Sequence, residues 1–168
     1  MKRRSLLACG VALTPLAAAF VGGCSADDEG RWAEGMLPIK WDRDTCARCG
    51  MAISDRRFAA QLRGGPKNAA VKFDDIGCAA TWCAEKLNDN AWLADAATRL
   101  WVAEFGGNGE RWLDARRAHY VKGGSRSPMG YDYAAHAQPQ PGSLGFDAMS
   151  RLVSATWPAN CVPGEDMR

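Results

Sequence analysis

The chain has 168 residues, of which 24% are charged and 47% hydrophobic. Three of its 21 Lys and Arg residues, and none of its 19 acidic residues, lie in the first 23 positions. The remainder therefore has 18 basic residues and a formal charge of −1. This balance leaves no basic stripe of the kind that binds nucleic acid. The remaining length, about 145 residues, is enough for one domain with its own core.

The first 23 residues have the features of an export signal. A positive stretch, Met1–Arg4, precedes an apolar run from Leu6 to Val21 that is shorter than the ~20 apolar residues of a spanning helix. The run ends in Val21-Gly-Gly-Cys24, which resembles the lipobox of bacterial lipoproteins. The resemblance implies an acylated Cys24 and a lipid anchor on the periplasmic side of the envelope, and Ser25 favours the outer membrane. An ordinary cleaved secretory signal is the alternative, and export by the general or the twin-arginine route stays open.

A polar segment, residues 24–43, is predicted to be a flexible tether, and a cysteine loop follows it. The loop contains Cys46, Cys49 and Met51, with Gly50 to turn the backbone between the last two. Thiolates and thioethers are soft donors that select soft ions such as Cu(I). The alternative interpretation is a disulfide between Cys46 and Cys49, with Met51 in the core.

Five cysteines follow Cys24, and an odd number in an oxidising compartment leaves at least one thiol to be occupied, buried or kept reduced. They are Cys46, Cys49, Cys78, Cys83 and Cys161. A structural zinc ion takes four ligands, and the cysteine loop supplies only two of them. A zinc site is disfavoured, because the other two would have to be Cys78 and Cys83. These two residues lie five apart on a predicted helix, about 140° from one another. A thioredoxin-like site is also disfavoured, because Gly50 follows Cys49 where such a site begins a helix.

Hydrophobic periodicity and turn residues predict short strands and two helices. Asp74 or Asp75 is expected to cap the first helix, and Asp147 the second, which ends at about residue 155. A loop at 123–128 presents Met129, and residues from 157 form an irregular tail. The predicted strands are 57–62, 70–73, 99–105, 111–114, 119–122 and 144–146, and the first helix runs from the cap to about residue 87.

A faint internal repeat links the two halves. In each half a methionine loop precedes two strands and a Phe-Asp pair that opens a helix, at Phe73-Asp74 and Phe146-Asp147. If the halves pair about a pseudo-twofold axis, their methionine loops meet. The repeat therefore predicts a three-sulfur site made of Cys49, Met51 and Met129.

Four segments, in combination, resemble the NosL family of copper-binding lipoproteins associated with assembly of nitrous oxide reductase. These segments are Cys49–Met51, Lys72–Cys78, Ala118–Val121 and Ser127–Gly130. The resemblance covers residues 44–156. It implies one compact α+β domain of the NosL/MerB-like type, built from two related β-β-α-β units. It also implies Cu(I) bound by Cys49, Met51 and Met129, and copper delivery to nitrous oxide reductase and its membrane-bound maturation machinery.

Other residues leave the ligand set open. Cys46 could be a second thiolate or a disulfide partner, and either His119 or His136 could complete the site, although a lone strand histidine is more often a surface residue. No Ser-His-Asp arrangement, phosphate loop or dinucleotide fingerprint is present, so we expect no enzyme. The sequence therefore predicts a copper metallochaperone. The alternative is a periplasmic thiol-disulfide protein that uses Cys46 and Cys49.

Overall fold

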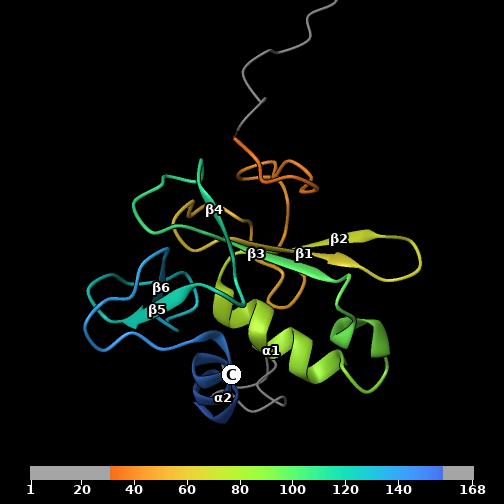
Figure 1. The fold of residues 1–168 in the computed structure, drawn as a ribbon. Coiled ribbons are helices and arrows are strands. Elements are labelled where there is room, and N and C mark those ends of the chain that lie inside the picture. The colour runs from red at the N-terminus through yellow and green to blue at the C-terminus, as the bar shows by residue number, and fades with distance from the viewer. Residues whose placement is uncertain (1–30, 157–168) are drawn as a thin grey trace, which may run out of the picture.

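Six strands and two α-helices follow one another in residues 31–156, the part of the chain that the computed structural model describes. Four strands form an antiparallel sheet in the order β2-β1-β3-β4, and two others form a separate antiparallel pair, β5-β6. Both helices lie on one side of the larger sheet, and α2 also contacts β5 (Figure 1). The predicted α+β class is therefore confirmed. The elements are β1 (Ala60–Gly64), β2 (Ala69–Phe73), α1 (Ile76–Lys86), the 3-10 helix η2 (Ala91–Ala94), β3 (Arg99–Ala103), β4 (Trp112–Asp114), β5 (His119–Lys122), β6 (Tyr133–His136) and α2 (Phe146–Thr156).

The core lies between the larger sheet and α1. Leu62 of the central strand β1 pairs with Val71 of β2 on one side and Leu100 of β3 on the other. Ile76 and Ala80 of α1 are fully buried beside this layer. Burying these apolar side chains removes them from water and supplies the main driving force for the fold.

Helix α1 begins where the sequence predicts. Asp75 has extended backbone angles (φ −144°, ψ 139°), and its carboxylate accepts a hydrogen bond from the Gly77 amide at 2.8 Å. This bond satisfies one of the amides that a helix leaves free in its first turn. Asp75 is therefore the N-cap, and it fixes the start of the helix that carries Cys78.

Several element boundaries differ from the prediction, and the predicted strand at 144–146 is only a single bridge between Leu144 and Tyr120. Strand β1 begins at Ala60 because Asp55 organises a turn before it, accepting from the Arg57 amide at 3.0 Å. Helix α2 begins at Phe146, so Asp147 is not its cap but lies in its first turn. There the helix dipole stabilises its negative charge. The order hairpin then helix recurs as β1-β2-α1 and β5-β6-α2, which is compatible with the predicted repeat.

The segment before the cysteine loop lies against the sheet. Met36 and Ile39 are buried, and the Gln61 side chain hydrogen-bonds both the amide and the carbonyl of Leu37, at 2.8 and 2.7 Å. Trp32 stacks on Trp41 with ring centroids 6.1 Å apart. The part of the predicted tether from residue 31 onward therefore packs on the domain.

Several sequence predictions lie outside the described residues: the signal at 1–23, Cys24, the start of the tether, Cys161 and the tail at 157–168. Among residues 31–156, neither helix has the length and apolar character needed to traverse a bilayer.

Candidate metal centre

Three cysteine side chains, from two separate segments, converge at the start of α1. The sulfur atoms of Cys46, Cys49 and Cys78 all lie within 4.8 Å of one another. Cys46 and Cys78 are buried, whereas Cys49 is half-buried, and none of the three forms a disulfide. We call these three residues the thiol cluster. Its spacing allows one ion to contact all three sulfurs.

A tight hairpin holds the first two sulfurs. Thr45 and Ala52 form an isolated antiparallel bridge at the base of the cysteine loop. Inside it, the Cys46 amide donates to the Met51 carbonyl at 2.8 Å, and the Gly50 amide donates to the Cys46 carbonyl at 2.9 Å. Gly50 has φ +74°, a left-handed conformation that glycine adopts without strain. The loop backbone therefore sets the spacing of Cys46 and Cys49 before any ion binds.

The third sulfur comes from the first turn of α1. Cys78 is the third residue of the helix, just behind the Asp75 cap. The amino end of a helix has a positive partial charge, which favours a thiolate placed there. Gly77 precedes it, and a methyl group at this position would overlap the Tyr131 ring. The glycine therefore lets the loop at 127–131, here called the Pro-Met loop, approach the helix closely.

The three thiols differ in acidity, and Cys46 is the one favoured as a thiolate. Hydrogen bonds from the Cys49 and Cys78 thiols hold the pKa of Cys46 well below its ordinary value, and the amides of Cys49 and Asp74 add to this against the effect of burial. The pKa values of Cys49 and Cys78 are raised, chiefly because each donates to the Cys46 sulfur. An ion that bound all three sulfurs would therefore displace two protons.

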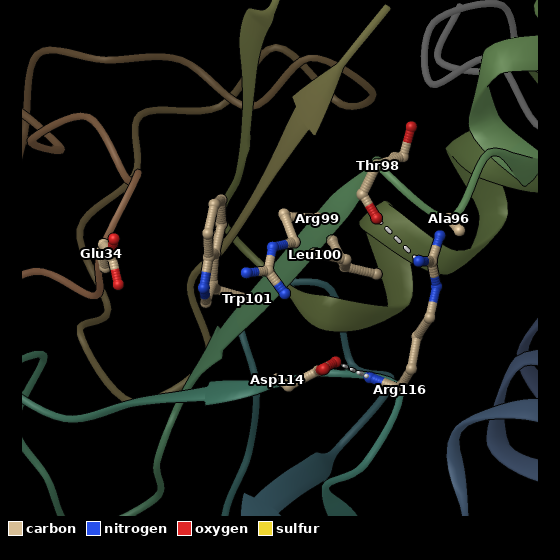
Figure 2. A pocket seen from close by; sticks show the side chains of 8 residues that line it. All are labelled: Glu34, Ala96, Thr98, Arg99, Leu100, Trp101, Asp114 and Arg116. Atoms are coloured by element: carbon tan, nitrogen blue, oxygen red, sulfur yellow. Dashed lines mark hydrogen bonds between the residues drawn. The ribbon is translucent and has the colours of Figure 1, made fainter.

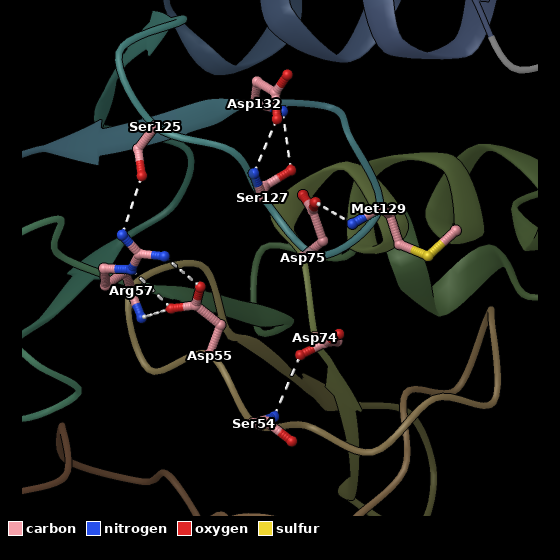
Figure 3. A network of polar contacts seen from close by, with 9 residues as sticks. All are labelled: Ser54, Asp55, Arg57, Asp74, Asp75, Ser125, Ser127, Met129 and Asp132. Atoms are coloured by element: carbon pink, nitrogen blue, oxygen red, sulfur yellow. Dashed lines mark hydrogen bonds and ion pairs between the residues drawn. The ribbon is translucent and has the colours of Figure 1, made fainter.

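Two buried carboxyl groups lie next to the cluster. Burial raises the pKa of Asp75 to about 6, and it raises the pKa of Asp74 to about 6 as well. Asp75 accepts from the Met129 amide at 3.4 Å, and Asp74 accepts from the Ser54 amide at 3.3 Å (Figure 3). These carboxyl groups connect the helix start to both surrounding loops through backbone amides.

The cysteine loop and the Pro-Met loop are in contact. Arg48 of the cysteine loop donates to the Tyr131 hydroxyl of the Pro-Met loop at 3.1 Å. Met51 is 47% exposed, and Met129 is half-buried against the core. Ligation by these two thioethers stays a prediction.

The remaining candidates lie elsewhere. His119 and His136 are direct partners across the β5-β6 pair, and the His136 ring lies 5.8 Å from that of Phe105. Neither histidine belongs to the thiol cluster. Cys83 also lies apart from it, and burial raises the pKa of its thiol to about 11.

Sequence reasoning missed Cys78 as a neighbour of the cysteine loop. It treated Cys78 and Cys83 as an all-or-none pair, whereas Cys78 alone joins the cluster. The available signal was its position three residues after the Asp75 cap, which puts it in the first helical turn.

A hollow of about 230 Å³ lies away from the cluster, on the β3-β4 side of the sheet. Figure 2 shows the Trp101 and Arg99 side chains in the middle of its lining, with Glu34 on the far side of Trp101 and Asp114 beside Arg116. Its lining includes Trp101 and Arg116 but no cysteine, methionine or histidine, so it offers no soft ligand for a metal.

The described fold and site define a small α+β protein with a cluster of three thiols. The family model NosL matches residues 39–142, more than half of the chain. The chain therefore belongs to the NosL family. A comparison with curated proteins gives no match. Among solved structures, the copper chaperone NosL from Shewanella denitrificans is similar, with 16% sequence identity and a TM-score of 0.46 over 72% of this chain and 86% of that one.

Proposed function

We propose that this protein is a Cu(I) metallochaperone whose central ligands are Cys46, Cys49 and Cys78. The convergence of three soft donors within 4.8 Å carries the proposal. Thiolates select Cu(I) or zinc among common ions, and a structural zinc site takes four ligands. Among the described residues, no fourth cysteine, histidine or carboxylate joins the cluster. This set suits a three-coordinate soft ion better than it suits zinc.

The proposal enlarges the ligand set that the sequence predicts. Cys49 stays in it, Cys46 changes from a possible to a central ligand, and Cys78 is added because the three sulfurs share the same space. Met51 and Met129 are proposed as auxiliary donors, and His119 and His136 are not included. Cys49 is the most exposed cluster residue, and the exposed Met51 follows it closely, so we propose that copper enters and leaves on this side.

We propose transfer of the ion without catalysis, and the same arrangement supports this role. A chaperone must release its ion, and a three-sulfur site leaves room for an incoming ligand of the recipient. We propose nitrous oxide reductase and its membrane-bound maturation machinery as the recipients, supported by membership in the NosL family. The proposed location is the periplasmic side of the envelope, with Cys24 acylated and the outer membrane favoured. A lipid anchor would raise the effective concentration of any membrane-bound partner.

Thiol-disulfide exchange by Cys46 and Cys49 is the competing function. This function would explain the pair of thiols in the loop, but it assigns no role to Cys78. A third thiol that hydrogen-bonds to Cys46 favours metal binding.

Anaerobic titration of the reduced protein against a Cu(I) chelator tests the metal. We expect one Cu(I) per chain and a clear preference over Zn(II). Equal stoichiometric binding of Zn(II) with no preference for Cu(I) would contradict the assignment. Delivery is tested in a denitrifying host, where deletion of the gene should leave nitrous oxide reductase made but poor in copper. Labelled palmitate should be incorporated into the wild type and not into Cys24→Ala.

A further inference from the structure

An arginine inside the cysteine loop contacts two other elements of the site. Arg48 lies between Cys46 and Cys49, and its side chain is only 10% exposed. Its Nη2 and Nε donate to one carboxylate oxygen of Glu85 in α1, at 2.9 and 3.3 Å. Its Nη1 donates to the Tyr131 hydroxyl in the Pro-Met loop at 3.1 Å. One guanidinium therefore connects the cysteine loop, the helix and the Pro-Met loop.

Both partners of Arg48 lie on elements that carry a sulfur. Glu85 follows Cys78 by seven residues, so the two lie on the same face of α1, two turns apart. Tyr131 follows Met129 by two residues, and its ring packs against Gly77, next to Cys78. The positions of all three sulfur-bearing elements are therefore tied to the same side chain.

The chemistry of these contacts makes Arg48 hard to replace. A guanidinium removed from water is costly unless it is paired and hydrogen-bonded, and here both conditions are met. Its planar fork can hold a carboxylate and a phenol in fixed directions at once, which a lysine ammonium cannot do. The positive charge also interacts with Cys78. Three thiolates around Cu(I) would carry two net negative charges, so a nearby cation stabilises the loaded site.

We propose that Arg48, Glu85 and Tyr131 form a clamp that sets the spacing of Cys78 relative to the cysteine loop and thereby the affinity for Cu(I). Its members act as positioning residues and do not touch the ion. The copper part of this inference rests on the proposed function, whereas the spacing of the sulfurs does not.

Variants of the full-length chain test the clamp through Cu(I) affinity. Arg48→Met should weaken binding about 10-fold or more, the usual effect of losing a charge-assisted hydrogen bond. Arg48→Lys should restore part of the loss, because it keeps the charge but not the fork. Tyr131→Phe keeps the ring on Gly77 and should cost less than Arg48→Met. The matched control is Arg111→Met, which removes an ion pair with Glu104 from a surface turn and should bind like wild type.

Proximity of the sulfurs gives a second measurement that needs no copper. Dibromobimane alkylates two neighbouring thiols and bridges them, with loss of two bromide ions and two protons. Bridges that include Cys78, identified by peptide mass mapping of the metal-free protein, should fall in Arg48→Met and Tyr131→Phe. Bridges between Cys46 and Cys49 should persist, since one loop holds both residues.

The outcomes separate the two proposals. Loss of Cys78 bridging together with loss of Cu(I) affinity supports the clamp. Wild-type bridging and affinity in folded Arg48→Met and Tyr131→Phe would overturn it. If the wild type binds no Cu(I) but the variants lose Cys78 bridging, the clamp stands and the copper function fails. The melting temperature of each variant is also measured. A value well above the assay temperature shows that the loss arises in the folded protein.

Discussion

Lowering the pH should weaken Cu(I) binding steeply, because binding displaces two protons. In the metal-free cluster we expect the thiolate on Cys46, because the hydrogen bonds that it accepts depress its pKa. Cys49 and Cys78 retain their protons in the neutral range, because their pKa values are raised. Both must lose them to bind the ion as thiolates. Affinity should therefore be highest at alkaline pH and fall as protons compete for these two sulfurs.

The proton count fixes the magnitude. Each displaced proton changes the binding free energy by about 1.36 kcal/mol per pH unit, so two protons change it by about 2.7 kcal/mol. The dissociation constant should therefore rise about 100-fold for each unit by which the pH falls through the neutral range. Cys46 adds nothing to this slope until the pH approaches its own depressed pKa.

Competition with a chelator of known protonation, run anaerobically between about pH 6 and about pH 8, measures the slope in the neutral range where these protons are displaced. A site made of Cys49, Met51 and Met129 has one thiol to deprotonate, so it predicts only about a tenfold change per unit. A dissociation constant that changes only about tenfold per pH unit would therefore refute the three-thiol account. It would support the ligands predicted from sequence instead. The protein must be free of zinc in this assay, because bound zinc would already have displaced the same protons.

Three further predictions follow from the surroundings of the cluster. Gly77→Ala should destabilise the protein by about 1–3 kcal/mol, because its methyl group overlaps the Tyr131 ring, whereas Gly145→Ala, which meets nothing within 4 Å, should leave the melting temperature close to wild type. Burial raises the folded pKa of Asp75 above its unfolded value, so the stability from its protonated form is complete below the unfolded pKa and is lost as pH rises through about 6. The melting temperature of the metal-free wild type minus that of Asp75→Asn should accordingly be larger at about pH 5 than at about pH 7, and this comparison cancels the opposite contribution of Cys46, whose folded pKa is depressed. A difference that does not change with pH would contradict the prediction. Met51→Ala should keep affinity within about threefold of wild type but slow copper transfer to a chelator, since a thioether is a neutral donor on the exposed side.

Local signals were enough to predict much of the fold. The Asp75 cap, the glycine turns and the alternating strands identify α1, β2, β3 and β5 within a few residues. Boundaries failed where side chains compete with regular structure. The Asp55 side chain binds the Arg57 amide and delays the start of β1 to Ala60. Such turn contacts depend on a specific side-chain geometry that a pattern of hydrophobicity does not encode.

The site was only partly predictable for a different reason. Cys46 and Cys49 are neighbours in sequence, so the cysteine loop is visible there. Cys78 reaches them through tertiary packing, which places the first turn of α1 beside a loop some thirty residues earlier. Helical periodicity separates Cys78 from Cys83 but does not say which face meets the loop. The contact between Arg48 and Tyr131 spans 83 residues, and the sequence indicates it only through the faint repeat.

The central claim is that copper binds all three thiols, and X-ray absorption at the copper edge tests it most directly. The Cu(I)-loaded wild type should show three sulfur neighbours around copper, and Cys78→Ser should lose one of them together with most of the affinity. Cys83→Ser, a cysteine of the same helix outside the cluster, is the matched control and should be unchanged. An unaltered sulfur shell and affinity in Cys78→Ser would contradict the account.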